Sequence, residues 1–374
     1  MSAERTYLDW NATAPLRPEA RAACISALDV VGNPSSPHAE GRRARAIVED
    51  AREQVAALVG AKPAEVVFTS GGTEANNSVL AAVWDTIVLP SVEHDSVRGP
   101  ARASKARVIE IPVGRNGVVS VDALAAIDGS AGRSLVSLQL ANNETGVIQP
   151  VAEVAAVAKA HGVFVHTDAV QAAGRIPVDL RALGVDCLSL SAHKIGGPKG
   201  VGALVIHERA SLPAFIAGGG QERRRRAGTE NVAAIAGFGA AAEAARRDIA
   251  RMRDVAELRE RLEREVRALT PGVVVIGADV ARLPNTTNIA LAGTSAETLV
   301  IALDLAGVMV SAGAACSSGK VGTSHVLEAM GLETTLARAA IRVSLGWNSR
   351  ESDVATFVEA WSRVTARHRE RAVA

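Results

Sequence analysis

Lys194 follows the apolar run CLSLS in the segment SAHKIGGPKG, which covers residues 191–200. Six residues of the chain are lysine, and two of them, Lys194 and Lys199, lie in this segment. Unlike arginine, lysine can lose its proton when it is desolvated and can form a Schiff base with an aldehyde. A lysine at a strand end is otherwise a solvated surface residue, so the surrounding residues decide between the two interpretations.

A carboxylate stands at the end of another apolar run, in VFVHTDAVQAAG at residues 163–174. Asp168 can cap the helix that follows, or it can keep the ring nitrogen of pyridoxal phosphate protonated. Because neighbouring parallel strands end at the same edge of a sheet, we expect Asp168 and Lys194 to lie close together. The pair predicts a pyridoxal phosphate site, with Lys194 bonded to the aldehyde and with Gly196 and Gly197 allowing a close turn of the backbone around it.

The segment SGGTEANN at residues 70–77 is a candidate for the phosphate of such a cofactor. It follows the apolar run EVVF and opens a helix, so backbone N–H groups and the helix dipole attract an anion at Gly72 and Thr73. Ser191 and His193, beside the lysine, add two polar side chains to this phosphate end. The alternative is an ordinary turn between a strand and a helix.

Two further polar residues follow apolar runs of the chain. His94, in SVEHDSV, can stack on the cofactor ring and move protons, because the ordinary imidazole pKa lies near neutrality. Asn143, in ANNETG, can bond the oxygen of the ring. Taken alone, each is equally well explained as a loop or turn residue.

The cysteines are Cys24, Cys187 and Cys316, and their wide spacing excludes a CxxC zinc site and does not favour a disulfide framework. Cys316 lies in SAGAACSSGKVGTSHVL, among small residues that do not build an apolar core. A free cysteine is commonly buried and inert, but this loop favours an exposed thiol that can act as a nucleophile. Cys24 and Cys187 lie in a helix pattern and a strand, and both are predicted to be core residues.

Arg342 lies in the apolar strand pattern AAIRVSLGW. A buried arginine needs an anionic partner, and its guanidinium group suits a carboxylate. That carboxylate belongs either to a substrate or to an aspartate or glutamate of the chain. The four arginines at residues 223–226 are interpreted as a solvated surface and not as a nucleic-acid site, since no aromatic residues interleave for base stacking.

The pattern of apolar runs predicts the elements that position these residues. Between residues 61 and 206, short apolar runs alternate with amphipathic helical stretches, which indicates an α/β fold with a mostly parallel sheet covered on both faces. The expected strands are EVVF, TIVLP, ARVIEIPV, SLVSLQL, VFVHTD, CLSLS and GALVI. A long, Ala-rich helical stretch ends at residue 269, and we place a domain boundary within it near residue 250. The remainder alternates strands with helices.

Length and charge exclude several classes of protein. With 374 residues, the chain is long enough for about two domains. Its net charge of +1 argues against a general polyanion binder. We find no signal peptide and no uncharged apolar stretch long enough to span a membrane, so we expect a cytoplasmic protein without a membrane partner.

Six segments taken together resemble the cysteine desulfurases, which belong to class V of the aminotransferase superfamily. They are SGGTEANN, HTDAVQAAG, SAHKIGGPKG, GGGQER with GTEN, SAGAACSSG and IRVSLG. The likeness extends from YLDWNATAP to the last strand, and around Cys316 it is to the subgroup with a long mobile loop. It implies fold type I of pyridoxal phosphate enzymes, with a large domain at residues 14–250 and a mostly parallel seven-stranded sheet. A smaller α/β domain would consist of residues 1–13 and 251–374.

The resemblance also assigns roles to single residues, with Lys194 carrying the cofactor and Asp168 pairing with its ring nitrogen. The further cofactor contacts that it implies are Gln171 and Asn143 at the ring oxygen, His94 stacked on the ring, Gly72, Thr73, Ser191 and His193 at the phosphate, and Thr229 at the phosphate of the other subunit. For the substrate it implies Arg342 at the carboxylate, Asn33 and His38 near the same pocket, and Cys316 as the nucleophile that accepts sulfur. Ala14 and Ala227 stand where the family commonly has threonine and serine.

The activity that the resemblance implies is the removal of sulfur from L-cysteine by a pyridoxal phosphate enzyme that acts as a homodimer. The products are L-alanine and a persulfide on Cys316, which passes its sulfur to an acceptor protein such as an iron–sulfur scaffold. Iron–sulfur cluster assembly is the expected destination, with tRNA thiolation and cofactor sulfuration as alternatives. No resident metal is expected, although Cys316 is a candidate for a transient iron–sulfur ligand shared with a scaffold. The competing interpretations are an aminotransferase or a selenocysteine lyase of the same fold, and a non-catalytic scaffold.

Overall fold

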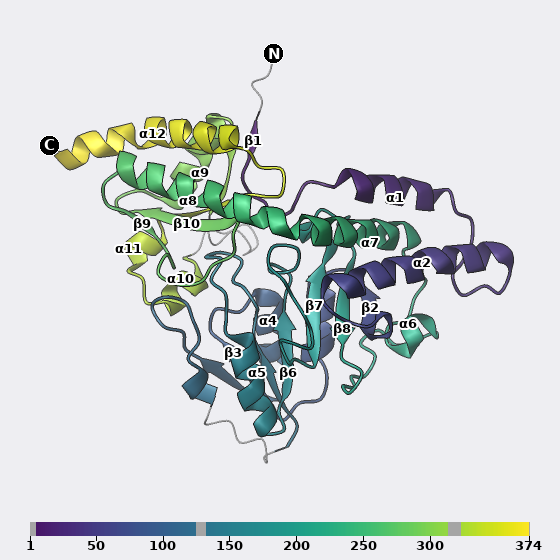
Figure 1. Cartoon of the computed structure of the whole chain (residues 1–374). Helices are drawn as coiled ribbons and strands as arrows, with labels where there is room; N and C mark the ends of the chain where they lie inside the picture. The colour runs from purple at the N-terminus through teal and green to yellow at the C-terminus, as the bar shows by residue number, and fades with distance from the viewer. Residues whose placement is uncertain (1–4, 125–131, 313–322, 374) are drawn as a thin grey trace.

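A seven-stranded sheet forms the centre of the larger part of the molecule (Figure 1). The structure is a computed structural model, and it describes residues 5–124, 132–312 and 323–373. In their order across the sheet, the strands are β2 (Val66–Thr69), β8 (Gly202–Ile206), β7 (Cys187–Ser191), β6 (Phe164–Asp168), β5 (Ser134–Ser137), β3 (Thr86–Pro90) and β4 (Arg107–Ile111). Strand β8 is antiparallel to both of its neighbours, and the other adjacent pairs are parallel. The predicted sheet is confirmed, and each strand overlaps one of the seven expected runs.

Both faces of this sheet are buried under helices. Along β3, Val88 packs into one buried apolar cluster, whereas Ile87 and Leu89 pack into another, because successive side chains point to opposite faces. The first cluster includes residues of α2 (Ala39–Leu58), α5 (Val151–Ala160) and α7 (Val232–Arg247), and the second includes residues of α3 (Gly72–Leu80) and α4 (Asp95–Ala103). Burial on both sides explains why β2, β3 and β8 are apolar at nearly every position.

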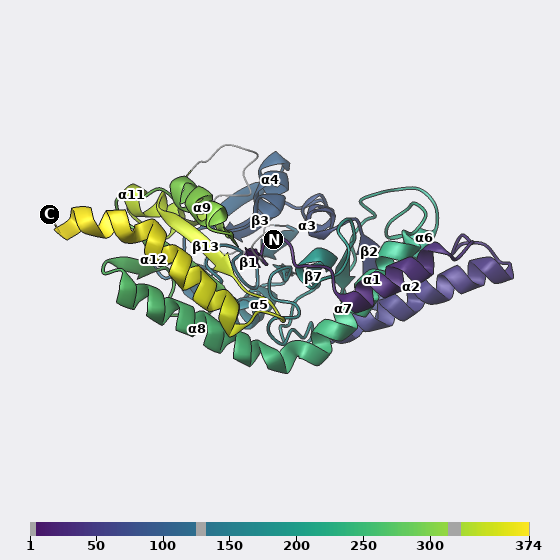
Figure 2. The same cartoon turned by 90° about the horizontal axis from the view of Figure 1, so that it is seen from above.

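Both ends of the chain build the smaller part, which lies at one end of the molecule (Figures 1 and 2). Its antiparallel sheet has the order β12 (Ser311–Ala312), β13 (Ala340–Ser344), β10 (Thr286–Leu291) and β9 (Val273–Val275), and β1 (Thr6–Tyr7) pairs in parallel with β11 (Val308–Met309). The helices of this part are α8 (Met252–Leu269), α9 (Ala296–Leu305), α10 (His325–Ala329), α11 (Thr334–Ala337) and α12 (Glu351–Val373). A buried cluster that includes Leu8, Phe357 and Trp361 fills its interior.

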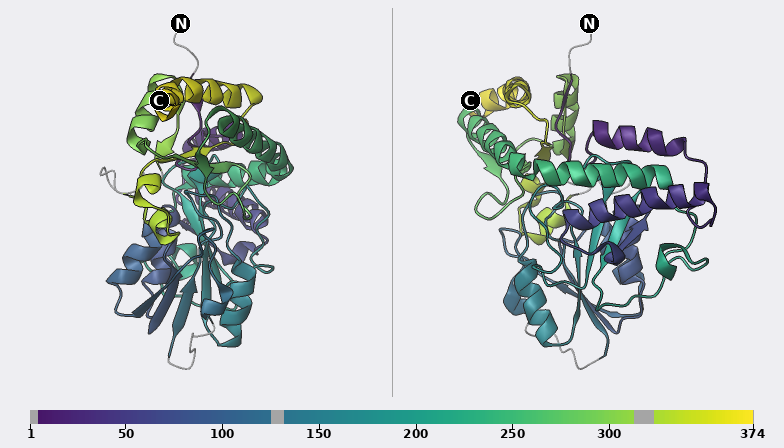
Figure 3. Two further views of the ribbon diagram at one scale, coloured as in Figure 1. Left: turned by 90° about the vertical axis from the view of Figure 1, so that its left-hand side faces the viewer. Right: turned by 45° about the vertical axis from the view of Figure 1, so that its right-hand side comes forward.

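Helices α7 and α8 connect the two parts, with a 3-10 turn at Asp248–Arg251 between them. On the larger part, α1 (Pro18–Leu28) and α2 lie alongside α7 (Figures 1 and 3). The 3-10 turn agrees with a boundary near residue 250, and the domain limits given above stay a prediction. None of the helices in the described ranges combines the length and the apolar character that crossing a membrane requires.

Three successive residues within α6 (Gln221–Arg224) adopt left-handed backbone conformations although none is glycine. The φ angles of Glu222, Arg223 and Arg224 are 45°, 55° and 65°. Such a conformation costs roughly 1–2 kcal/mol per residue. The buried Glu222 carboxylate offsets this cost, because it accepts hydrogen bonds from Arg52 at 2.7 and 2.9 Å and from the Phe68 amide at 2.9 Å. The turn is therefore held from the inside, while Arg223 and Arg224 are exposed.

Replacing Glu222 by alanine is expected to lower the free energy of unfolding by about 3–5 kcal/mol, because Arg52 would stay buried without its anion. Urea unfolding followed by circular dichroism measures this loss. Glu257→Ala is the control, since its carboxylate lies 3.7 Å from Arg253 on the exposed side of α8, and its loss should stay below about 1 kcal/mol. Equal losses in the two variants would contradict a structural role for the buried pair.

Candidate active site

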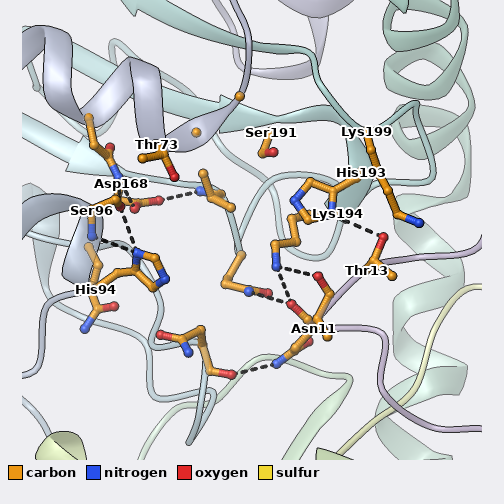
Figure 4. Close-up of a pocket in the computed structure, with 18 of the residues that line it drawn as sticks. Asn11, Thr13, Thr73, His94, Ser96, Asp168, Ser191, His193, Lys194 and Lys199 are labelled. Atoms are coloured by element: carbon orange, nitrogen blue, oxygen red, sulfur yellow. Dashed lines mark hydrogen bonds between the residues drawn. The ribbon is translucent and has the colours of Figure 1, made fainter. Parts of the chain in front are cut away.

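A pocket of about 500 Å³ lies at the carboxyl ends of the parallel strands (Figure 4). Ten residues predicted from the sequence line it: Gly72, Thr73, His94, Asn143, Asp168, Gln171, Ser191, His193, Lys194 and Arg342. They come from the segments that follow β2, β3, β5, β6 and β7 and from the smaller part's β13. The parallel arrangement of the strands is what brings these distant segments to one edge of the sheet.

The Lys194 side chain turns into this pocket and not into bulk solvent. Lys194 ends the short 3-10 helix Ala192–Lys194, directly after β7. Its Nζ donates hydrogen bonds to the main-chain oxygens of Asn11 at 2.5 Å and Ala12 at 2.9 Å. Gly196 follows with a φ of 84°, and a Cβ there would lie 2.4 Å from the Trp347 ring. The backbone beside the lysine thus makes a close turn at Gly196.

The Asp168 carboxylate is held in a fixed orientation at the end of β6. Its Oδ2 accepts a hydrogen bond from Asn76 Nδ2 at 2.7 Å, and its Oδ1 accepts one from the Val170 amide at 2.9 Å. Asn76 also donates to Ser96 Oγ at 2.8 Å. Asp168 therefore both caps the turn that follows β6 and presents a buried carboxylate to the pocket, so the two interpretations of this residue are compatible.

His94 caps the N-terminus of α4, and this contact fixes the orientation of its ring (Figure 4). Its Nδ1 accepts a hydrogen bond from the Ser96 amide at 3.1 Å and lies 2.8 Å from Ser96 Oγ. Because Nδ1 acts as an acceptor, the proton of the neutral ring is on Nε2. The ring lines the pocket near Asp168.

The opening of α3 forms the anion-attracting end of the pocket. Gly72 has no room for a side chain, because a Cβ there would lie 2.7 Å from Val170 Cγ2. His193 stands on the opposite segment, with Nδ1 3.2 Å from Thr13 Oγ1. Burial, and then the charges of Lys194 and nearby cations, lower the pKa of His193 to about 4. At neutral pH its imidazole is thus an uncharged hydrogen-bonding group.

Arg342 lines the pocket and already has an acidic partner in the chain. Its Nη2 donates to Asp9 Oδ1 at 2.7 Å, and its Nη1 donates to the Asn143 main-chain oxygen at 3.1 Å. Its Nε is buried without a hydrogen-bond partner among the described residues. Asp9 is therefore the carboxylate of the chain that was expected as one possible partner of Arg342. Binding of a substrate carboxylate by Arg342 stays a prediction.

Sequence reasoning assigned no role to several residues that shape this pocket. Asn11 accepts hydrogen bonds from Lys194 and from Gln171 Nε2, and its own Nδ2 donates to the Asn143 main-chain oxygen at 3.1 Å. Asn76, Ser96 and Arg175 were also missed. Asn11, Asn76 and Ser96 lie within the quoted segments YLDWNATAP, SGGTEANN and SVEHDSV, whereas Arg175 lies in none of the quoted segments.

Three predicted residues do not line the pocket of their own chain. Thr229 is exposed in the connection between α6 and α7. Asn33 and His38 are exposed in the loop between α1 and α2, where His38 Nδ1 caps α2 by accepting from the Gly41 amide at 3.2 Å. Figure 1 shows this loop at the far end of the two helices. The roles given to these residues stay predictions.

The cysteines fall into three different situations. Cys316 lies outside the described residues. Cys187 is fully buried on β7, and burial raises the pKa of its thiol well above the ordinary value, as expected for a core cysteine. Cys24 is only partly buried on α1, so its assignment to the core was too strong, although burial still raises the pKa of its thiol.

Glu144 is a buried carboxyl group behind the pocket wall, next to Asn143. It is 4% exposed, and its Oε2 accepts a hydrogen bond from Ser324 Oγ at 2.5 Å. Burial raises its pKa to about 7, against the opposing effects of Ser324, Arg342 and His94. Ser324 also caps α10 by accepting from the Leu327 amide at 3.2 Å. This contact ties the start of α10 to the large sheet's edge.

Known proteins resemble the chain over nearly its whole length. Residues 6–357 match the family described as Aminotransferase class-V. The cysteine desulfurase IscS of Dictyoglomus turgidum is 42% identical, over 96% of this chain and 94% of that protein. The X-ray structure of a NifS-like protein from Rickettsia africae has a TM-score of 0.90 at 36% identity, covering 97% of this chain and all of the other. A structure described as SspA in complex with cysteine has a TM-score of 0.79 at 29% identity, covering 91% of this chain and 98% of the other.

Replacing Glu144 by glutamine is expected to change how stability depends on pH. The raised pKa means that the folded protein keeps a proton on Glu144 between pH 4.5 and about 7, whereas the unfolded chain has lost it. Stability from this group is therefore present below pH 4.5 and is lost as the pH rises through 7, by about 3 kcal/mol in all. Urea unfolding at several pH values should show that Glu144→Gln lacks this component.

The matched control for this pH series is Glu328→Gln, which changes an exposed carboxylate on α10. Its stability should follow the pH dependence of the unmodified protein. If the free energies of unfolding of Glu144→Gln and the unmodified protein differ by the same amount at every pH, Glu144 is not the source of the pH dependence.

Proposed function

The chain belongs to the class-V aminotransferase family, and from this premise we propose that its pocket binds pyridoxal phosphate and L-cysteine and removes sulfur from the latter. Relatives named cysteine desulfurase share 42% of their residues with the chain over nearly its whole length, and the chain is an enzyme of this kind. The observation that carries the proposal is the convergence of the Lys194 amine and the Asp168 carboxylate in one pocket at the ends of adjacent strands.

Three features of the pocket fit pyridoxal phosphate. The Lys194 amine, directed inward, suits its aldehyde. The buried Asp168 carboxylate suits its ring nitrogen. The opening of α3, where Gly72 leaves no space for a side chain, suits its phosphate. Ser191 and His193 border the same end of the pocket. In a homodimer, the partner subunit's Thr229 would join them.

Some residues of the pocket would bind and orient the ligand, and others would transfer protons. Bound pyridoxal phosphate would supply an electron-withdrawing ring that makes the Cα proton of the amino acid substrate acidic. Asp168, fixed by Asn76 and the Val170 amide, would keep a proton on the ring nitrogen. His94 would cover one face of the ring and exclude water from it. Lys194 Nζ would move the Cα proton.

The substrate carboxylate is placed at Arg342. Asp9 and the Asn143 carbonyl anchor the guanidinium group, so it would meet the carboxylate in a fixed orientation. The similar SspA structure is a complex with cysteine, which supports L-cysteine as the substrate here. Asn33 and His38 do not line their own chain's pocket, so a place near the substrate would require the pocket of a partner subunit.

Cys316 is proposed as the sulfur acceptor. Its thiolate forms an S–S bond to the substrate sulfur while the substrate's C–S bond breaks, and a proton replaces the sulfur on Cβ to give L-alanine. The persulfide then passes its sulfur to an acceptor protein, for which iron–sulfur cluster assembly is the proposed destination. Exposed apolar side chains along and after α1, at Ile25, Leu28 and Val31, support a homodimer.

Cys316→Ala protein is expected to keep the visible absorbance of bound pyridoxal phosphate and to release no L-alanine from L-cysteine, because the cofactor site is intact and the acceptor thiol is missing. Alanine and sulfide release in the presence of a reductant measure this. Cys24→Ala, which changes a partly buried thiol outside the pocket, should keep full activity.

Each possible result of this assay bears on a different part of the proposal. Normal alanine release by Cys316→Ala would remove the nucleophile assignment. A colourless unmodified protein that traps no borohydride adduct at Lys194 would remove the cofactor. Turnover that depends on an added keto acid and not on Cys316 would favour an aminotransferase.

A further inference from the structure

Arg175 is a buried cation whose hydrogen-bond partners are all uncharged. It lies in the turn after β6 and is 7% exposed. Its guanidinium group donates to the Gln171 main-chain oxygen at 3.0 Å, to Gln171 Oε1, and to the Trp10 main-chain oxygen at 3.3 Å. Within the described ranges, Arg175 has no acidic partner at ion-pair distance.

Burial and the nearby charge of Arg342 lower the pKa of Arg175 to about 9, so at neutral pH it is still charged. A buried charge without a counter-ion is costly, and a site that keeps one gains most when an anion binds close by. Arg175 is near enough to the pocket for its charge to lower the pKa of His193 as well. The positive charge of Arg175 is therefore available to compensate an anionic ligand of this pocket.

The contact with Arg175 also decides which end of the Gln171 amide faces which neighbour. A glutamine amide has an acceptor oxygen and a donor nitrogen, and partners of opposite character fix its orientation. Here Oε1 accepts from the guanidinium group, and Nε2 donates to the Asn11 main-chain oxygen at 3.1 Å. The reverse orientation would set amide N–H groups against guanidinium N–H groups and an oxygen against a carbonyl oxygen, so both hydrogen bonds would be lost.

The Gln171 amide nitrogen carries two hydrogens, and Asn11 uses one of them. Gln171 lines the pocket, so the other hydrogen is available to a ligand atom that accepts a hydrogen bond. A carbonyl oxygen of Gln171 in the same place would instead repel such an atom. This wall of the pocket is thus built for an acceptor oxygen that carries negative charge.

We propose that Arg175 is a positioning residue that fixes the Gln171 amide with its N–H toward the ligand and supplies the positive charge that stabilises an anionic oxygen there. This inference rests on the proposed function, in which that oxygen is the ring oxygen of pyridoxal phosphate. Arg175 itself touches Gln171 and Trp10 and acts through them.

The test uses the apo protein and titrates pyridoxal phosphate into four variants, Arg175→Met, Arg175→Lys, Gln171→Met and the double variant Arg175→Met with Gln171→Met. Tryptophan fluorescence and visible absorbance report binding, and the pH midpoint of the visible absorbance change is recorded for each bound form. Arg175→Met should weaken binding roughly tenfold, the loss typical of one hydrogen bond to a charged group. It should also move the midpoint to higher pH, since removing a positive charge makes protonation of the bound group easier.

The remaining variants separate positioning from charge. Arg175→Lys keeps the charge without the planar group, so its midpoint should stay close to that of the unmodified protein while its affinity falls. If Arg175 acts through Gln171, the affinity loss caused by Arg175→Met should be much smaller when Gln171 is already methionine. The melting temperature of each apo-protein variant shows whether that variant folds. If Arg175→Met does not fold, the affinity of Arg175→Lys is compared with that of Gln171→Met instead.

Two outcomes overturn the inference. One is an Arg175→Met protein that binds pyridoxal phosphate with unchanged affinity and an unchanged midpoint. The other is an equal affinity loss with and without Gln171, which would make Arg175 a structural residue only. If the unmodified protein itself binds no pyridoxal phosphate, the proposed function fails instead, so the two failures are distinguishable.

Discussion

The main-chain oxygen of Asn11 is the acceptor on which the geometry of the pocket depends. It receives the Lys194 amine at 2.5 Å and the Gln171 amide at 3.1 Å, so one atom positions groups from two different segments of the large sheet's edge. The Asn11 side chain extends the same network to Thr286 Oγ1 at 2.9 Å, on the smaller part's β10. The N-terminal segment is therefore the element that joins the two parts at the site, and its main-chain oxygens at Asn11 and Ala12 align the lysine.

The charged residues around the pocket include more cations than anions. Lys194, Lys199 and Arg342 line it, together with the acids Asp168 and Glu74. Arg175 lies behind it, Asp9 pairs with Arg342, and Glu74 pairs with Arg226. His193 adds no positive charge, because burial and the charges of Lys194, Lys199 and Arg175 keep it neutral. Among these groups positive charge exceeds negative charge, which favours ligands that carry phosphate and carboxylate groups.

The sequence predicts the parts of the site that arise from local pattern. Apolar runs that each end in a polar residue placed Lys194, Asp168 and His94 at one edge of a parallel sheet, because that edge follows from strand direction alone. It does not predict the pairing of Arg342 with Asp9, which are 333 positions apart. Nor does it reveal the role of Asn11, since a main-chain oxygen is present at every residue and its use depends on how the chain is threaded. Arg175 lies seven residues beyond the end of β6 and resembles any turn residue until its buried surroundings are known.

The threading of the N-terminal segment has a consequence for biosynthesis. Asn11 N donates to Ser344 Oγ at 3.0 Å, 333 positions further along the chain, and β1 pairs with β11, so this segment has to wait for partners that are made much later. On the ribosome, the large sheet has all its strands once residue 206 has emerged. The carbonyl groups that align the lysine cannot take their places until β13 has left the exit tunnel. A ligand that depends on these carbonyl groups would therefore meet a complete pocket only after residue 344 has been synthesised.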